Sequence, residues 1–200
     1  ADDDYGNLRL KAYSAAINGG NNALAVDVNG QSLTTDLDGN SRIYGDVVDI
    51  GAYEYHEYTV VVDTFDDVVD ANDGYMSLRE AIAQAAVTSG DDIIQLQAGD
   101  YVLTSGELTI DNTSGRLSIV GVGGLATLNA HGYGSVMEVV DGSEVLLKNL
   151  GITGSGTGIG GTGILSLDSC EVYGNDCGIS LGNGTLSMSN SMVYGNDDGV

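Results

Sequence analysis

The sequence predicts an all-β protein, a parallel β-helix with coils of about 20–21 residues and one capping α-helix near its start. The first observation is a repeat. The segment 165–178 recurs at 186–199, which aligns Tyr173 with Tyr194. The second is that each copy alternates apolar and polar residues over short stretches broken by Gly, Asn, Asp and Ser, which is typical of strands joined by turns. A single coil cannot bury its own apolar face, so successive coils must stack.

A third, looser copy of the coil precedes these two. It occupies residues 146–159, and its step to the following copy is one residue shorter, which aligns Ile152 with Val172. When the coils stack, the side-chain amides of Asn175 and Asn196 are expected to lie one above the other as an asparagine ladder. Asn is also a frequent turn residue, and this simpler role is an equally open interpretation. Tyr173 and Tyr194 would form a matching aromatic ladder.

The segment before the coils predicts one amphipathic helix over residues 77–89. Ser77 and Glu80 have the spacing of a capping box, in which each side chain bonds the backbone N–H of the other residue. Apolar residues follow at helical spacing, and Gly90 stands where a C-terminal cap is expected. Such a helix would cover the unpaired backbone and apolar surface at the first coil of the solenoid.

Short apolar runs after the helix predict the first strands of the β-helix. They divide the later part of the chain into residues 56–92, with a linker strand, an acidic loop and the capping helix, and residues 93–200, which form the coils. The strands expected upstream of the clear repeats are 93–97, 101–103, 108–110, 117–120 and 136–140.

The run from Val60 to Ile82 carries a family resemblance. It resembles the start of the CSLREA domain, with Met76 in place of that family's cysteine. The resemblance implies a right-handed β-helix of the pectate-lyase-like type, which this domain opens in large bacterial surface proteins. The downstream coils with Gly-Asn turns are similar to the β-helices that follow it. The resemblance implies no particular chemistry, because these families lack an established common activity.

Residues 1–55 resemble a different domain. Their runs 13–20, 36–42 and 48–55 are similar to the choice-of-anchor Q domain, a segment that closes the far end of a β-helix in that family. Residues 1–55 are therefore expected to form a terminating or junction segment. A terminating segment followed by an initiating one is the order expected where one β-helix ends and the next begins in a tandem array.

The chain reaches Val200 partway through a coil, without a recognisable cap after it. An uncovered solenoid end favours edge-to-edge pairing. The expected partners are therefore copies of the chain itself or adjacent tandem repeats, joined head to tail, an arrangement that generates fibres.

Charge and composition restrict the partners and the location. The formal net charge of −23 excludes nucleic acid as a partner on electrostatic grounds. The apolar runs are too short to span a bilayer, so no membrane insertion is expected in this segment. The family resemblance implies an extracellular or cell-surface location. Cys170 and Cys177 lie close together, which fits either a small-loop disulfide or two buried thiols.

Clusters of oxygen-bearing side chains make Ca²⁺ a candidate cofactor, because hard cations prefer oxygen ligands. One cluster precedes the helix, and the other is an Asp-x-Asp-Gly-Asn loop near the start of the chain. Neither has the spacing of an EF-hand, and plain acidic turns explain both equally well. The candidate ligands are Asp63, Asp66, Asp67, Asp70, Asn72 and Asp73 in the first cluster and Asp36, Asp38 and Asn40 in the second.

The sequence offers little catalytic patterning. Asp176 and Asp197 lie one coil apart and could form a carboxylate pair, but Asp in turns is usually solvated. His56 and His131 are far apart in a chain without a nucleophile motif. No catalytic residue is therefore assigned, and the chain is not expected to be an enzyme.

The sequence favours a non-catalytic structural module of an extracellular fibre or cell-surface stalk, which assembles head to tail through the ends of its β-helix. The alternative is a carbohydrate-active or glycan-binding β-helix that acts on polysaccharide and has surface glycans as partners. Stacked aromatic or basic residues along a groove would favour that alternative.

Overall fold

The computed structural model describes residues 8–10, 14–88, 90–132 and 134–200. The described residues form two compact units. Unit 1 comprises those up to Tyr58 together with 90–91, and unit 2 comprises 59–88 and those from Asp92 onward. The boundary at Tyr58 lies close to the expected end of the junction segment at residue 55. Three pieces of the predicted elements lie outside the described residues: residues 1–7 and 11–13 of the junction segment, with Tyr13 of its first family-like run, and Ser89 of the helix.

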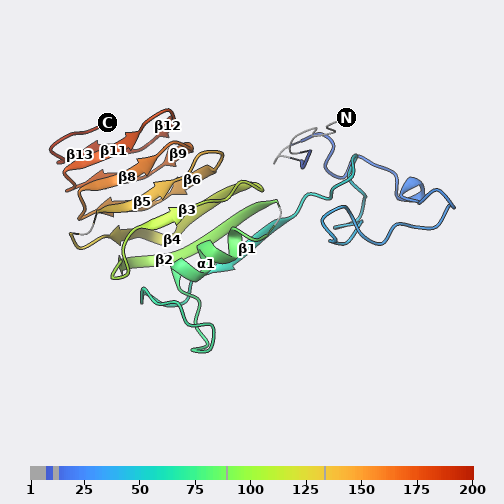
Figure 1. The fold of residues 1–200 in the computed structure, drawn as a ribbon, viewed down its shortest axis with the longest axis horizontal. Coiled ribbons are helices and arrows are strands. Elements are labelled where there is room, and N and C mark those ends of the chain that lie inside the picture. The colour runs from blue at the N-terminus through green and yellow to red at the C-terminus, as the bar shows by residue number, and fades with distance from the viewer. Residues whose placement is uncertain (1–7, 11–13, 89, 133) are drawn as a thin grey trace. The chain divides into compact units, whose positions relative to one another are not determined.

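Unit 1 has little regular structure, whereas unit 2 is a stack of short strands with one helix (Figure 1). The 3-10 helix η1 spans Asn22–Leu24, and the α-helix α1 spans Leu78–Ala85. The strands are β1 (Glu57–Val61), β2 (Asp91–Val102), β3 (Leu108–Ile110), β4 (Arg116–Asn129), β5 (Ser135–Val139), β6 (Glu144–Lys148), β7 (Leu150–Thr153), β8 (Thr157–Gly161), β9 (Ile164–Asp168), β10 (Glu171–Tyr173), β11 (Cys177–Leu181), β12 (Thr185–Ser189) and β13 (Met192–Tyr194).

Unit 2 is a parallel β-helix, which confirms the predicted fold. Its strands belong to a nine-stranded sheet, with the order β12-β9-β6-β4-β7-β10-β13 and with β2 and β1 added beside β4, and to a four-stranded sheet, β11-β8-β5-β3. The registers match the repeat: Tyr173 pairs with Tyr194 of the following copy, and Val172 pairs with Ile152 of the looser copy. Each coil therefore lies directly on the one before it.

Aliphatic side chains fill the interior in vertical stacks, because the parallel register places like residues above one another. In the first stack Ile94 lies beside Ile119, which lies beside Leu147. The four-stranded sheet contributes a stack of its own from β3 to β11. Its members are Leu108, Met137, Ile159 and Ile179, each no more than 1% exposed. Burial of each such side chain contributes about 1.5–3 kcal/mol, so these stacks are the main apolar source of stability.

The helix α1 packs its apolar face, which includes Leu78 and Ile82, into the same hydrophobic core. The capping box is present, with Ser77 accepting from the Glu80 N–H and Glu80 accepting from the Ser77 N–H. The predicted C-terminal boundary was wrong: the helix ends at Ala85, and Gly90 does not cap it. The Thr88 hydroxyl lies 3.1 Å from the Ala85 carbonyl oxygen and 2.6 Å from the Asp92 carboxylate, so it joins the end of the helix to the start of β2.

Several predicted strands are longer in the structure. The runs 93–97 and 101–103 belong largely to the single strand β2, which carries a register shift between Gln97 and Gly99. The run 117–120 is the first part of β4, which continues past Gly123 and Gly124, both at positive φ. These irregular positions read as strand ends in the sequence, but the chain bends there and keeps pairing with the next coil.

Among the residues that the structure describes, no helix has the length and apolar character needed to cross a membrane.

Candidate functional site

The acidic loop between β1 and α1 is held by a buried carboxylate. Asp67, whose side chain is 4% exposed, accepts from Arg79 Nε at 2.8 Å and from Arg79 Nη2 at 3.1 Å. It also accepts from the backbone N–H groups of Thr104 and Ser105, each at 2.7 Å. Arg79 reaches on to the carbonyl oxygens in the turn between β2 and β3. This arrangement, the Asp67 clamp, ties the loop to the first coil.

The clamp determines the ionisation of Asp67. Burial by itself raises the pKa of this carboxyl, but the hydrogen bonds and charge of Arg79, with the N–H groups of Ser105 and Thr104, outweigh it and leave the pKa below its usual value. The sequence analysis missed the clamp. The clamp could have been anticipated from Arg79, which lies within the capping-box motif and is the one basic residue close to a dense acidic loop in the sequence.

Other carboxylates of the loop accept from nearby backbone N–H groups. Asp63 accepts from the Met76 N–H at 2.7 Å, and Asp70 accepts from the Asn72 N–H at 3.0 Å. Asp73 accepts from the Tyr75 N–H at 2.8 Å. The bonds of Asp70 and Asp73 are those of acidic turns, whereas the bond of Asp63 joins the start of the loop to the residue before the helix N-cap. Asp66 is exposed at the surface of the loop.

The second predicted calcium cluster lies in unit 1 and has the same kind of local bonding. Asp36 accepts through one oxygen from the N–H groups of Asp38 and Asn40, both at 2.9 Å, and through the other from the Glu54 N–H at 3.1 Å. Asp38 pairs with Arg9, whose guanidinium lies 4.8 Å from the centre of the Tyr53 ring. The Asp36 carboxylate therefore organises the loop from within.

The structure does not gather the predicted calcium ligands into one centre. Within the described ranges, no three His, Cys, Asp or Glu side chains come together in a way that could hold a metal ion. The two clusters belong to different units. Calcium binding stays a prediction from the sequence.

Unit 1 is organised around buried polar groups that the sequence analysis did not single out. Arg42 forms an ion pair with Glu54, and both residues are buried. Asp49, also buried, accepts from the N–H groups of Asn18 and Tyr55, each at 2.6 Å. Buried charges are costly unless they are paired and hydrogen-bonded, so this network determines how unit 1 folds.

Unit 1 buries little apolar surface. Among its described residues, the buried hydrophobic side chains are Ala25 and Val48. Many larger ones are exposed, and Val28 is fully so. The exposed set is Leu8, Leu24, Val26, Val28, Leu33, Leu37, Tyr44, Ile50 and Tyr58. Unit 1 therefore leaves most of its larger apolar side chains available for contact with another surface.

The predicted asparagine ladder is present in the turns of the last coils. Asn175 is 4% exposed, and its side-chain amide donates to the Asn196 carbonyl oxygen at 3.1 Å. The same Asn196 oxygen accepts from the Asn175 backbone N–H, just as the Asn175 oxygen accepts from the Ser155 N–H at 3.1 Å. Each turn is therefore tied to the next by the same pair of groups.

The predicted tyrosine ladder is also present. The rings of Tyr173 and Tyr194 stack with centroids 5.5 Å apart and planes at 13°. The Tyr194 hydroxyl donates to Glu171 at 2.9 Å, and this hydrogen bond raises the pKa of Tyr194. Because the two rings cover each other's facing sides, these faces are closed to a ligand.

The two cysteines are free thiols, so the disulfide alternative is wrong, and of the two thiols Cys170 alone is buried. Cys170 is buried and directs its Sγ toward the Leu147 carbonyl oxygen at 3.2 Å. Burial raises the pKa of this thiol. Cys177 begins β11 and is only partly buried.

The residues considered for catalysis do not form one site. The register of Cys177 with Asp198 places Asp176 next to Asp197, and both are exposed turn residues. His56 belongs to unit 1, where its ring contacts that of Tyr44 with centroids 4.3 Å apart. His131 is an exposed turn residue of unit 2.

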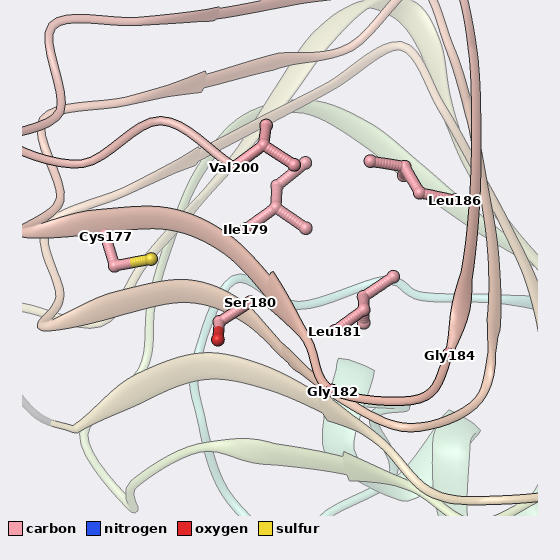
Figure 2. Close-up of a pocket in the computed structure, with 8 residues that line it drawn as sticks. All are labelled: Cys177, Ile179, Ser180, Leu181, Gly182, Gly184, Leu186 and Val200. Atoms are coloured by element: carbon pink, nitrogen blue, oxygen red, sulfur yellow. The ribbon is translucent and has the colours of Figure 1, made fainter.

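The last coil forms an edge with a hollow at its centre, shown in Figure 2. Among the described residues, β12 and β13 pair on one side only, with β9 and β10, whereas β11 pairs with β8 and also bonds residues 198–199 on its other side. Between them lies an open hollow of about 310 Å³. Its lining is Cys177, Ile179, Ser180, Leu181, Gly182, Gly184, Leu186 and Val200. We call these strands and this hollow the coil edge.

Compared with family models, with curated proteins and with solved structures, the chain gives no match.

We predict that Asp67→Asn lowers the free energy of unfolding by about 2 kcal/mol at neutral pH, the scale of hydrogen bonds to a charged group. The folded-state pKa of Asp67 lies below the unfolded value near ~3.9, so its stabilisation is complete above that pH and is lost as the pH falls through the folded pKa. Urea unfolding at a series of pH values measures the difference, which should shrink toward acid. The exposed-site control Asp66→Asn should change stability little, and an equal effect of the two substitutions would contradict the clamp.

We predict that Asn175→Ala destabilises the β-helix by about 2 kcal/mol, because it leaves the Ser155 N–H and the Ile152 carbonyl oxygen without their bonds to Asn175. Urea unfolding measures this loss. Asn183→Ala, at an exposed turn of the next coil corner, is the matched control and should be nearly neutral. Equal stability of the two variants would show that the ladder contributes nothing.

Proposed function

We propose that this chain is a non-catalytic structural module of an extracellular fibre or cell-surface stalk. Its units join head to tail: the coil edge of one copy, or of one tandem repeat, meets unit 1 of the next. The resemblances to the CSLREA and choice-of-anchor Q domains support the location and the order of the two units. The parallel β-helix supports the role, because a solenoid extends along one axis by adding contacts between neighbours.

The observation that carries the proposal is that unit 1 exposes many more apolar side chains than it buries. Its described residues bury Ala25 and Val48 and expose a much larger apolar set. Unit 1 is ordered by polar contacts such as the ion pair between Arg42 and Glu54, and not by a hydrophobic core. A segment that is conformationally fixed and apolar outside is suited to docking, because little ordering entropy remains to be lost on binding.

The coil edge supplies a complementary surface. β12 and β13 each have an outer row of backbone groups that a further coil or a segment of a neighbouring unit can bond. Ile179, Leu181 and Leu186 line its hollow, and Val200 at its rim is 80% exposed. An edge of this kind favours strand addition and apolar contact together.

The opposite end of the β-helix supports a head-to-tail order. There α1 packs against the core through Leu78, Ala81, Ile82 and Ala85. A coil edge therefore cannot stack on the first coil of another copy without displacing this helix. We assign the contact to unit 1, whose exposed apolar set includes Val28, and a contact between two different surfaces repeats without closing.

The glycan-binding alternative receives less support. A sugar stacks on the flat face of an aromatic ring, and the facing sides of Tyr173 and Tyr194 cover each other. The net charge of −23 also repels an acidic polysaccharide. The same charge makes assembly sensitive to cations, which screen repulsion between neighbouring units, and this is the role we propose for Ca²⁺.

We predict that the chain self-associates in sedimentation velocity and forms filaments in electron microscopy, more strongly with Ca²⁺ than after chelation. Two substitutions at exposed positions should each stop growth at one end: Val28→Asp in unit 1 and Val200→Asp at the coil edge. Each variant alone should be monomeric. In an equal mixture, the intact coil edge of Val28→Asp can meet the intact unit 1 of Val200→Asp. The mixture should therefore form a dimer and grow no further.

The matched control is Val87→Asp, which places the same charge at an 83% exposed site after α1 that belongs to neither proposed surface. It should assemble like the wild type. A mixture of the two end variants that stays monomeric would contradict head-to-tail joining. Dimers of Val28→Asp alone would instead show contact between two coil edges.

A further inference from the structure

Two sites in the chain carry the Asn-x-Ser/Thr pattern that oligosaccharyltransferases recognise, where x is not Pro. The first is Asn112-Thr-Ser114, and the second is Asn183-Gly-Thr185. The pattern alone does not separate them. Their surroundings in the structure do, because a transferase needs the amide nitrogen of Asn in solvent and free of other bonds.

The first site is closed. Asn112 is 2% exposed, and its amide nitrogen lies 3.4 Å from the Asp92 carboxylate. Its amide oxygen accepts from the Ser114 hydroxyl at 2.9 Å, so the two recognition residues of the pattern bond each other. Asn112 also lies beside the buried Ser143, whose hydroxyl accepts from the Asn112 backbone N–H at 3.0 Å. A transferase cannot reach this amide without unfolding the first coils.

The second site lies on an outward bulge between β11 and β12. Before the bulge Leu181 pairs with Gly161, and after it Thr185 pairs with Ile164. The turn at 182–184 therefore holds one residue more than the corresponding turn at 162–163 of the previous coil. This additional residue must be accommodated between the two strands, and it is the origin of the longer repeat.

The contacts of Gly184 show which part of the bulge packs against the previous coil. A Cβ on Gly184 would lie 2.5 Å from the Gly163 carbonyl oxygen, so Gly184 is pressed against the previous coil. Asn183, in contrast, is exposed, and its side chain makes no hydrogen bond to any residue that the structure describes. Thr185 is exposed as well. Figure 2 shows the flanking Gly182 and Gly184 at the corner of the coil, apart from Val200.

We propose that Asn183 is an N-glycosylation site, modified by an oligosaccharyltransferase from a lipid-linked diphosphate oligosaccharide. The Asn183 amide nitrogen forms a bond to the anomeric carbon of the first sugar. The bond from that carbon to the diphosphate oxygen breaks, the lipid diphosphate leaves, and the amide loses one proton to a base of the transferase. This inference rests on the extracellular location in the proposed function, because lipid-linked donors are used on exported chains.

The test uses the purified, folded 200-residue chain with a membrane-extracted oligosaccharyltransferase and its lipid-linked donor. Two synthetic peptides, residues 108–118 and 179–189, are assayed beside it. We expect both peptides to accept the oligosaccharide, whereas the folded chain gains the mass of a single glycan. Peptide mapping after treatment with an N-glycosidase, which converts the modified Asn to Asp, should place it at Asn183.

Matched substitutions complete the test. Asn183→Gln and Thr185→Val should each abolish the mass gain, and Asn112→Gln should leave it unchanged. An unmodified folded chain beside a modified 179–189 peptide would overturn the proposal, as would modification at Asn112. The test measures mass and not assembly, so the two proposals can fail separately. A chain that is glycosylated but stays monomeric would refute the fibre and support the site. A chain that assembles but gains no glycan would support the fibre and refute the site.

Discussion

The hydrogen-bonded stacking of one coil on the next is the constraint on which the β-helix depends. Stacked parallel coils lie about 4.8 Å apart, and at some positions the backbone of the next coil leaves no room for a side chain. A Cβ on Gly158 would lie 2.5 Å from the Gly178 carbonyl oxygen, and one on Gly178 would lie 2.5 Å from that of Gly199. Glycine is thus required at equivalent places in successive coils. The same register turns each aliphatic residue into part of a stack and each turn Asn into part of a ladder, so local sequence and global fold impose the same period.

The conformation of unit 1 is stabilised by polar contacts and not by stacking. It has no repeat to stack, and instead of an apolar interior it uses carboxylates that accept from backbone N–H groups, as Asp36 and Asp49 do. Such a network fixes a conformation through satisfied polar groups, since leaving one of them unpaired would be costly. It does not remove apolar side chains from water, which leaves Val28 and its neighbours exposed. Polar order inside and apolar surface outside are the properties of a segment that completes its burial on another surface.

The repeat made the coils predictable from sequence, because one period determines strands, turns, ladders and register at once. Tyr173 and Tyr194 were aligned correctly for this reason. The chemistry of the acidic residues was less predictable, since a carboxylate accepts equally well from a cation and from an N–H group. The partners of Asp67, at Arg79 and at Thr104 and Ser105, become neighbours only when the loop meets the turn after β2. The predicted end of the helix was also wrong, and Thr88, which was expected to be helical, instead bonds Asp92 of β2.

A β-helix has two kinds of surface, and their physical chemistry separates the two roles inferred for this chain. Axial surfaces end in backbone groups and apolar side chains, so contact there extends the stack and favours another protein segment. Corner surfaces such as that of Asn183 are free to vary, because an inserted residue there moves outward and leaves the strand register on both sides intact. A bulky hydrophilic group on a corner therefore costs the stack little, whereas the same group on the axis would block it. Modification at corners and assembly along the axis are compatible for this reason, and a fibre module can carry both.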